Sequence, residues 1–247
     1  MHNAAFRALH MAARYVRLAA GSSEEALRKA RSRGVNGLNV TSPFKEDFVR
    51  HCDELDGSAR ILGAVNTVVF KDEKAYGFNT DVYGVAKALR SNGVSLKGKR
   101  AIVLGAGGAA KAAVHALISG GAMVTMVNRT AQKARAIAES MICRHSTLRP
   151  EELKGAFKDA EIVVSAVGTT KRIVPRSLLK ETMTVLEANY TAQTALTRDA
   201  QQKGCRVIDG REWLLFQGAK AFEIFTRKKA PIATMRKAVY KEIRKGI

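Results

Sequence analysis

Apolar positions along the chain alternate between two spacings, one typical of strands and the other of helices. Short, mostly apolar runs at 101–106, 161–168, 184–189 and 205–210 predict buried strands, and stretches with helical spacing lie between them. The chain also changes repeatedly from one pattern to the other before residue 97. This alternation favours an α/β fold built on largely parallel sheets.

The first part of the chain contains several further predicted elements. Ser22 is followed by Ser and two Glu residues, which is typical of a capped helix N-terminus, and Gly93 is placed to end a helix. We expect helices over 3–14, from 22, over 46–56 and up to 93, and strands over 15–20, 35–41, 64–70 and at the start of 75–93.

A change of character at 97–100 suggests two α/β domains. A sharp strand, a glycine-rich turn, an alanine-rich helix and a second strand follow, which together have the size of a βαβ unit. Helical spacing returns after Gly210, and a last helix is expected after Pro231. We therefore predict a first domain of residues 1–82 and 213–247, in which the C-terminal helices pack back, and a Rossmann-like second domain of residues 83–212.

Composition narrows the class of protein. Of 247 residues, 46% are hydrophobic and 26% are charged, which is enough to bury a sizeable core. The first residues resemble no secretory peptide and no apolar run is long enough to span a bilayer, so we expect a cytoplasmic protein without membrane contact. Cys52, Cys143 and Cys205 form no CxxC pair, so reduced thiols and no metal site are expected.

The formal net charge of +20 favours anionic partners. Nucleic acid is one such partner, yet only 6% of the residues are aromatic and no basic stripe is interleaved with aromatic residues. The charge therefore predicts a basic surface that attracts phosphate and carboxylate metabolites, and argues against nucleic acid.

A glycine-rich turn marks a candidate cofactor site. Gly105-Ala106-Gly107-Gly108-Ala109-Ala110 follows a predicted strand and opens a helix, so its backbone N–H groups can receive a pyrophosphate. NAD sites usually carry Asp or Glu at the end of the next strand, but Asn128 and Arg129 stand there, the former 23 positions after Gly105. A guanidinium suits a 2′-phosphate, so NADP is expected, with further contacts from Thr130 and Lys133.

Polar residues fall at the ends of predicted strands in the first domain, in three groups. They form the clusters Asn39, Thr41 and Lys45; Asn66 and Thr67; and Asn79 and Asp81. Because the carboxyl ends of parallel strands converge, these clusters could surround one small polar molecule. Lys45 could stabilise or protonate an oxygen during hydride transfer between an alcohol and a ketone, with Asp81 holding Lys45 in place.

The motifs GLNVTSPFK, GAVNT, GFNTD, GAGGAA, NRT and DGREWLLFQ together resemble the shikimate dehydrogenases over nearly the whole chain. The resemblance implies NADP-dependent, reversible reduction of 3-dehydroshikimate to shikimate, in a cleft between two α/β domains. It makes Lys45 and Asp81 the catalytic pair. It implies substrate contacts from Thr41, Asn66, Tyr190 and Gln217, and cofactor contacts from Gly105 to Ala110, Asn128, Arg129, Thr130, Lys133 and Gly210.

The front of the chain departs from the family pattern. Family members begin with a strand and a segment resembling SxSPxMHNAAF, whereas this sequence reads Met1-His2-Asn3 from its first residue. We therefore expect a chain that lacks this first strand and the serine pair that binds the substrate carboxylate. Such a truncated chain would bind NADP better than shikimate.

Other interpretations stay open at this point. A quinate dehydrogenase shares most of these motifs but generally prefers NAD, against which Arg129 argues. Glutamyl-tRNA reductase shares only the NADP half and lacks NVTSPFK. A catalytically weak NADP-binding or RNA-binding module is a third alternative, from a different class. The sequence does not give the oligomeric state, and a homodimer is compatible with it.

Overall fold

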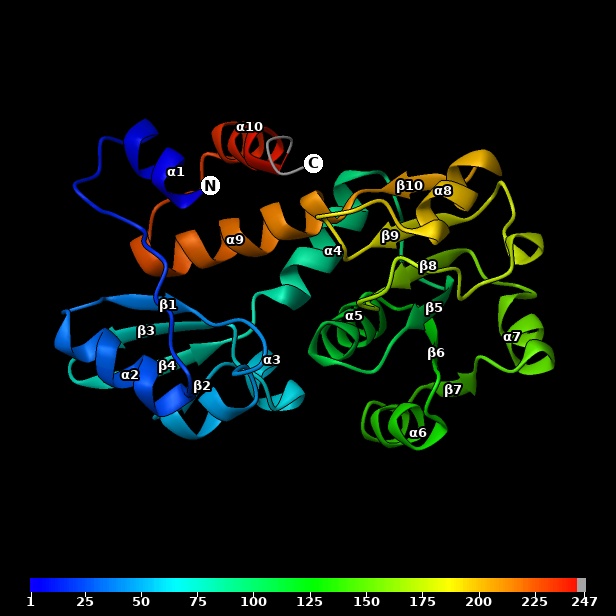
Figure 1. The fold of residues 1–247 in the computed structure, drawn as a ribbon, viewed down its shortest axis with the longest axis horizontal. Coiled ribbons are helices and arrows are strands. Elements are labelled where there is room, and N and C mark those ends of the chain that lie inside the picture. Colours follow the sequence, from blue (N-terminus) through cyan, green and yellow to red (C-terminus); the bar gives the residue numbers. More distant parts are fainter. Residues whose placement is uncertain (244–247) are drawn as a thin grey trace.

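The computed structural model describes residues 1–243, which form two sheets joined by helices (Figure 1). The first sheet has four strands in the order β1-β3-β4-β2, and the second has six in the order β10-β9-β8-β5-β6-β7. The strands are β1 (Gly37–Asn39), β2 (Glu54–Leu55), β3 (Thr67–Lys71), β4 (Lys74–Phe78), β5 (Arg100–Leu104), β6 (Met123–Asn128), β7 (Arg144–Thr147), β8 (Ile162–Ser165), β9 (Thr184–Glu187) and β10 (Arg206–Ile208).

The helices complete the α/β architecture that the hydrophobic pattern predicted. They are α1 (His2–Ala8), α2 (Ser23–Ser32), α3 (Gly57–Leu62), α4 (Asp81–Ser91), α5 (Gly108–Ser119), α6 (Ala131–Ser140), α7 (Pro150–Phe157), α8 (Ala195–Gln202), α9 (Gly210–Thr226) and α10 (Ile232–Ile243), with the 3-10 turns η1 (Asp47–His51) and η2 (Arg176–Leu178). In the described part of the chain, no helix combines the length and the apolar character needed to cross a bilayer.

The six-stranded sheet is parallel throughout. Its strand order reverses between β5 and β8, and ligands of open α/β sheets bind at the carboxyl ends of the strands beside such a reversal. Both faces are covered, because alternate residues of β5 belong to two different cores. This explains why its strands appear in the sequence as continuous apolar runs.

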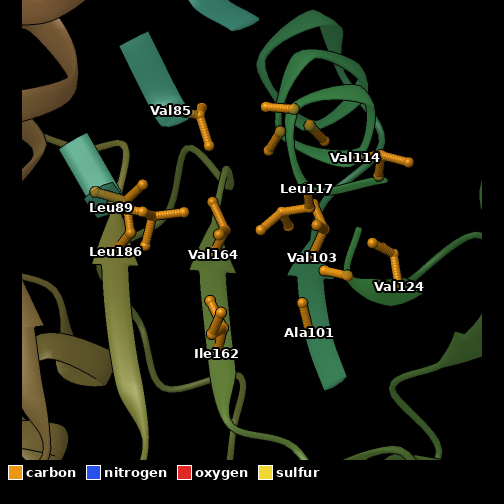
Figure 2. Close-up of a cluster of buried hydrophobic side chains, with 14 of the residues drawn as sticks. Val85, Leu89, Ala101, Val103, Val114, Leu117, Val124, Ile162, Val164 and Leu186 are labelled. Atoms are coloured by element: carbon orange, nitrogen blue, oxygen red, sulfur yellow. The ribbon is translucent and has the colours of Figure 1, made fainter. Parts of the chain in front are cut away.

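One of these cores joins the sheet to α4 and α5 (Figure 2). Val85 and Leu89 of α4 and Leu117 of α5 are fully buried against Val103 and Val164. Each fully buried aliphatic side chain of this size contributes about 1.5–3 kcal/mol. The core therefore holds α4, whose first residue belongs to the candidate site, firmly against the six-stranded sheet.

The first sheet is mixed, which corrects the expectation of a largely parallel arrangement there. β3 pairs antiparallel with β1 and β4, and only the short β2 is parallel to β4. The cause is the connection between β3 and β4, where Asp72 and Glu73 both have positive φ, 49° and 63°. A two-residue turn of this kind joins antiparallel neighbours.

Three local expectations were wrong. Residues 15–20 do not form a strand, since Tyr15 exchanges backbone hydrogen bonds with the Asn3 side chain and not with a neighbouring strand. The helix expected over 3–14 ends at Ala8, and the one expected over 46–56 is only the 3-10 turn η1 followed by β2. The helix expected from Ser22 is confirmed, because the Ser22 hydroxyl accepts the Glu25 N–H at 3.1 Å.

The C-terminal helices pack back on the first part of the chain, as predicted. α9 lies along α4 and touches β3, and α10 packs against both α9 and α1 (Figure 1). The close approach of α4 and α9 requires Gly84, because a Cβ there would lie 2.7 Å from Trp213 Cδ1 and 2.9 Å from Gln217 Cβ. This approach brings Gln217 of α9 beside the residues at the start of α4.

Candidate active site

The loop after β1 carries Lys45 and is held to the chain before β3. Val40 N–H donates to Asn66 O at 2.8 Å, and Val65 N–H donates to Lys45 O at 2.8 Å. Within the loop, Phe44 N–H donates to Thr41 O at 3.0 Å, which closes a turn. These bonds place the loop and Asn66 side by side.

Lys45 meets Asp81 at the N-terminus of α4. Lys45 Nζ donates to Asp81 Oδ2 at 2.7 Å, and the two side chains are 21% and 10% exposed. Asp81 N–H donates to Asn79 Oδ1, while Asn79 Nδ2 donates to the Ala64 carbonyl, so the start of α4 is fixed to the same loop region. A short, partly desolvated pair of this kind is stronger than one on the open surface.

A cleft of about 2320 Å³ opens over this pair. It brings together all the residues predicted to act on or bind the substrate, namely Thr41, Lys45, Asn66, Asp81, Tyr190 and Gln217. Ala109 and Gly210 line the same cleft from the side of the six-stranded sheet. The cleft therefore lies between the two sheets, and continues into a groove beside residues 11–20.

The glycine-rich turn lies where β5 ends and α5 begins. Gly105 has a φ of +112°, and a Cβ there would come within 2.8 Å of the Ala166 carbonyl at the end of β8. Gly107 caps α5, and no acidic residue stands in the first turn of this helix. The turn is thus built for close approach of a phosphate group to the N-terminal N–H groups of α5.

The end of β6 offers a cation and no carboxylate. Arg129 is exposed and, among the described residues, makes no hydrogen bond or ion pair, so its guanidinium is free to bind an anion. Asn128 Nδ2 donates to the Thr130 carbonyl at 3.1 Å, which shapes the turn, and Lys133 is exposed on the first turn of α6. None of these four residues lines the cleft.

One contact between α5 and the loop that carries Lys45 has no signal in the sequence. Lys111 Nζ of α5 donates to Glu46 Oε1 at 3.0 Å. Glu46 directly follows Lys45 in the sequence, and Lys111 lies 65 positions after Glu46. Thr80, between Asn79 and Asp81, was also missed: its backbone and hydroxyl both bond to the Asn66 side chain. Only the motif GFNTD could have drawn attention to it.

The fold and the site define a two-domain nucleotide-dependent oxidoreductase, with a lysine–carboxylate pair facing a dinucleotide-binding sheet. Three family models match the chain: the shikimate dehydrogenase substrate binding domain over residues 1–68, shikimate / quinate 5-dehydrogenase over 86–202, and the shikimate 5′-dehydrogenase C-terminal domain over 210–240. The chain belongs to the shikimate dehydrogenase family.

Individual relatives agree with this membership. The NADP(+) shikimate dehydrogenase of Natronomonas pharaonis is 42% identical over 97% of this chain and 92% of the relative, and that of Pyrococcus abyssi is 36% identical over 100% and 93%. Among solved structures, the Thermus thermophilus shikimate 5-dehydrogenase in complex with NADP(H) and shikimate is similar, with a TM-score of 0.88 and 33% identity over 97% of this chain and 92% of that one.

The comparisons do not support the expectation of a truncated chain. The substrate-domain model matches from residue 1, and the similarity to the Pyrococcus abyssi protein extends over the whole chain.

Proposed function

We propose that the chain catalyses the reversible, NADP-dependent reduction of 3-dehydroshikimate to shikimate, a step of aromatic amino-acid biosynthesis. The observation that carries the proposal is the Lys45–Asp81 pair, which lies in the same cleft as Ala109 at the start of α5. The relatives named as NADP(+) shikimate dehydrogenases support the same activity and cofactor.

The cofactor contacts follow from the chemistry of the residues present. The glycine cradle at Gly105 and the N-terminus of α5 fit a pyrophosphate, held by Gly105, Ala106, Gly107, Gly108, Ala109 and Ala110. The unpaired Arg129, with Asn128, Thr130 and Lys133, fits a 2′-phosphate. Gly210 borders the cleft where the nicotinamide would reach the substrate. When bound there, NADPH would supply the hydride.

Three of the substrate contacts come from the opposite wall, and the fourth comes from the loop after β9. Thr41, Asn66 and Gln217 bind the ring hydroxyls, and Tyr190, 41% exposed at the rim, contacts the region of the substrate carboxylate. Their side chains supply hydroxyl and amide groups, which are the partners that a polyhydroxylated ring requires.

Lys45 handles the oxygen on which charge develops. As the carbonyl carbon of 3-dehydroshikimate becomes a secondary alcohol, its oxygen gains negative charge, and the Lys45 ammonium stabilises that charge and gives the oxygen a proton. Asp81 holds the ammonium in place through the 2.7 Å hydrogen bond. In the oxidation of shikimate, the amine of Lys45 accepts the hydroxyl proton.

Three further assignments rest on the same proposal. The substrate domain comprises residues 1–82 and 213–247, and the cofactor domain comprises residues 83–212. A homodimer and a cytoplasmic location stay predictions. Light scattering coupled to size-exclusion chromatography measures the oligomeric state directly.

The activity is tested by following NADP reduction at 340 nm with shikimate, with quinate and without a substrate. We expect turnover with shikimate that exceeds turnover with quinate, and slower turnover when NAD replaces NADP. Preference for quinate would favour the quinate dehydrogenase alternative. Binding of NADP without turnover of either substrate would contradict the proposal.

A further inference from the structure

The orientation of the Asn66 side-chain amide is determined by a backbone group. Thr80 N–H lies 2.8 Å from Asn66 Oδ1. A backbone amide can only donate a hydrogen bond, so the Asn66 atom at this distance must be the carbonyl oxygen and not the amide nitrogen. Asn66 Nδ2 must therefore point in the other direction.

Two hydroxyls add to this restraint. Thr67 Oγ1 and Thr80 Oγ1 lie 3.0 Å and 3.1 Å from Asn66 Oδ1, and both threonines are buried. Thr67 Oγ1 also accepts a hydrogen bond from Asn39 Nδ2 at 3.1 Å. Because Asn39 supplies that proton, the hydroxyl proton of Thr67 is free to turn toward Asn66.

The hydrogen bonds to Asn66 form a relay that begins at Tyr15 and passes through Asn39 and Thr67. Asn39 Nδ2 also lies 3.4 Å from the Asn66 backbone carbonyl, which can only accept, so the Asn39 nitrogen is on the side of Thr67 and Tyr15 O–H donates to Asn39 Oδ1 at 3.1 Å. Each donor along Tyr15, Asn39 and Thr67 thus points toward Asn66 Oδ1. A relay with one consistent direction holds the amide more firmly than a single bond does.

The amide nitrogen is what Asn66 presents to the cleft. Asn66 lines the cleft beside Lys45 and Asp81, and within the described residues its Nδ2 has no hydrogen-bond partner. We propose that Thr67 and Thr80 are positioning residues, which lock Asn66 so that it offers the substrate N–H donors and never an acceptor. This inference rests on the proposed function, in which Asn66 binds a ring hydroxyl.

The lock has a consequence for specificity. A substrate oxygen that accepts the Asn66 N–H satisfies a donor that is otherwise unpaired, whereas an analogue without that oxygen leaves it without a partner. If the Thr67 hydroxyl donor were lost, Asn66 Oδ1 would keep only its contacts with Thr80, and the amide would be held less firmly in this orientation. Substrate affinity would then fall although Asn66 itself was still present.

The test compares Thr67→Val, which removes the donor at nearly constant volume, with Thr67→Ser, which retains it. Thr184→Val is the matched control, since Thr184 is a buried strand residue whose hydroxyl makes no side-chain hydrogen bond within the described part of the chain. Each substitution is made with Asn66 present and in an Asn66→Ala background. The measurements are KM for shikimate, KM for NADP, kcat, and the melting temperature without substrate.

Because the Thr80 N–H still holds Asn66 Oδ1, we expect Thr67→Val to raise KM for shikimate about 3–10-fold, with kcat within about threefold of the parent and KM for NADP unchanged. Thr67→Ser and Thr184→Val should retain the parent KM for shikimate. In the Asn66→Ala background, Thr67→Val should have no further effect on this KM. A lowered melting temperature with an unchanged KM would show a merely structural role and overturn the proposal.

The melting temperature tests the lock independently of the activity. Thr67→Val should lower it by about 3–8 °C, of which the part due to the Asn66 contact should disappear in the Asn66→Ala background, while the part due to the lost Asn39 contact stays. Fully additive losses would overturn the lock even if shikimate is the substrate. Non-additive losses without turnover of shikimate would support the lock and contradict only the proposed function.

Discussion

Lys45 Nζ and Asp81 Oδ2 lie 2.7 Å apart, although the two residues are 36 positions apart in the chain. The loop after β1 supplies the lysine and the first turn of α4 supplies the carboxylate. This pair turns one of the chain's many lysines into a fixed donor that faces the cleft. The other residues predicted to bind the substrate line the same cleft as this pair.

We propose that the free guanidinium of Arg129 at the end of β6 selects NADP over NAD. Arg129→Ala should raise KM for NADP about 10–100-fold and leave KM for NAD unchanged, because only NADP carries the 2′-phosphate. Initial rates with both cofactors measure the change. Lys154→Ala removes an equal charge at a distant helix and should leave both values unchanged. An unchanged KM for NADP in Arg129→Ala would refute the assignment.

Two neighbouring glycines should respond differently to alanine. Gly105→Ala forces a φ of +112° on an L side chain and places its Cβ 2.8 Å from Ala166 O, so it should cost about 2–4 kcal/mol of stability. Gly107→Ala has ordinary φ and no atom within 4 Å of the added Cβ, and should cost about 1 kcal/mol or less. Urea unfolding of both variants measures the difference. Equal losses would show that the tight turn does not depend on Gly105.

His2 should make stability depend on pH. Its ring stacks on Tyr15 with centroids 4.5 Å apart, and burial lowers the pKa of His2 from 6.5 to about 4. Since the folded chain favours the neutral ring, this contribution is complete above pH 6.5 and is lost as the pH falls from 6.5 toward 4. Protonation should therefore cost about 3 kcal/mol over this interval.

His2→Phe provides the comparison, because it keeps an aromatic ring against Tyr15 and removes the titration. Urea unfolding at pH 7, 5.5 and 4 should show a smaller loss of stability in the variant than in the parent. Parallel losses in the two proteins would mean that the His2 ring is not held neutral by the fold.

The cofactor half was more predictable from sequence than the substrate half, and the physical reason is burial. β5, β8 and β9 are covered on both faces and appear as continuous apolar runs, whereas the edge strand β7, whose residues Arg144–Thr147 are polar, was missed. In the first sheet, the turn at Asp72 and Glu73 determines the strand direction; Asp is common at positive φ, but Glu73 stands where such turns usually have glycine.

The candidate site was predicted as a set of residues but not as a mechanism of positioning. Motif spacing was sufficient to name Lys45, Asn66 and Asp81, which all line one cleft. The contact between Lys111 and Glu46 and the orientation of Asn66 depend on how distant segments fold together. No local pattern of residue types contains that information.

The most direct test of the account is kcat of Lys45→Ala with shikimate and NADP, measured beside Lys74→Ala, which removes an exposed lysine of β4. Loss of the positioned ammonium should lower kcat about 10²–10⁴-fold while NADP still binds, and Lys74→Ala should match the parent. A kcat for Lys45→Ala within about threefold of the parent would contradict the central claim that Lys45 handles the reacting oxygen.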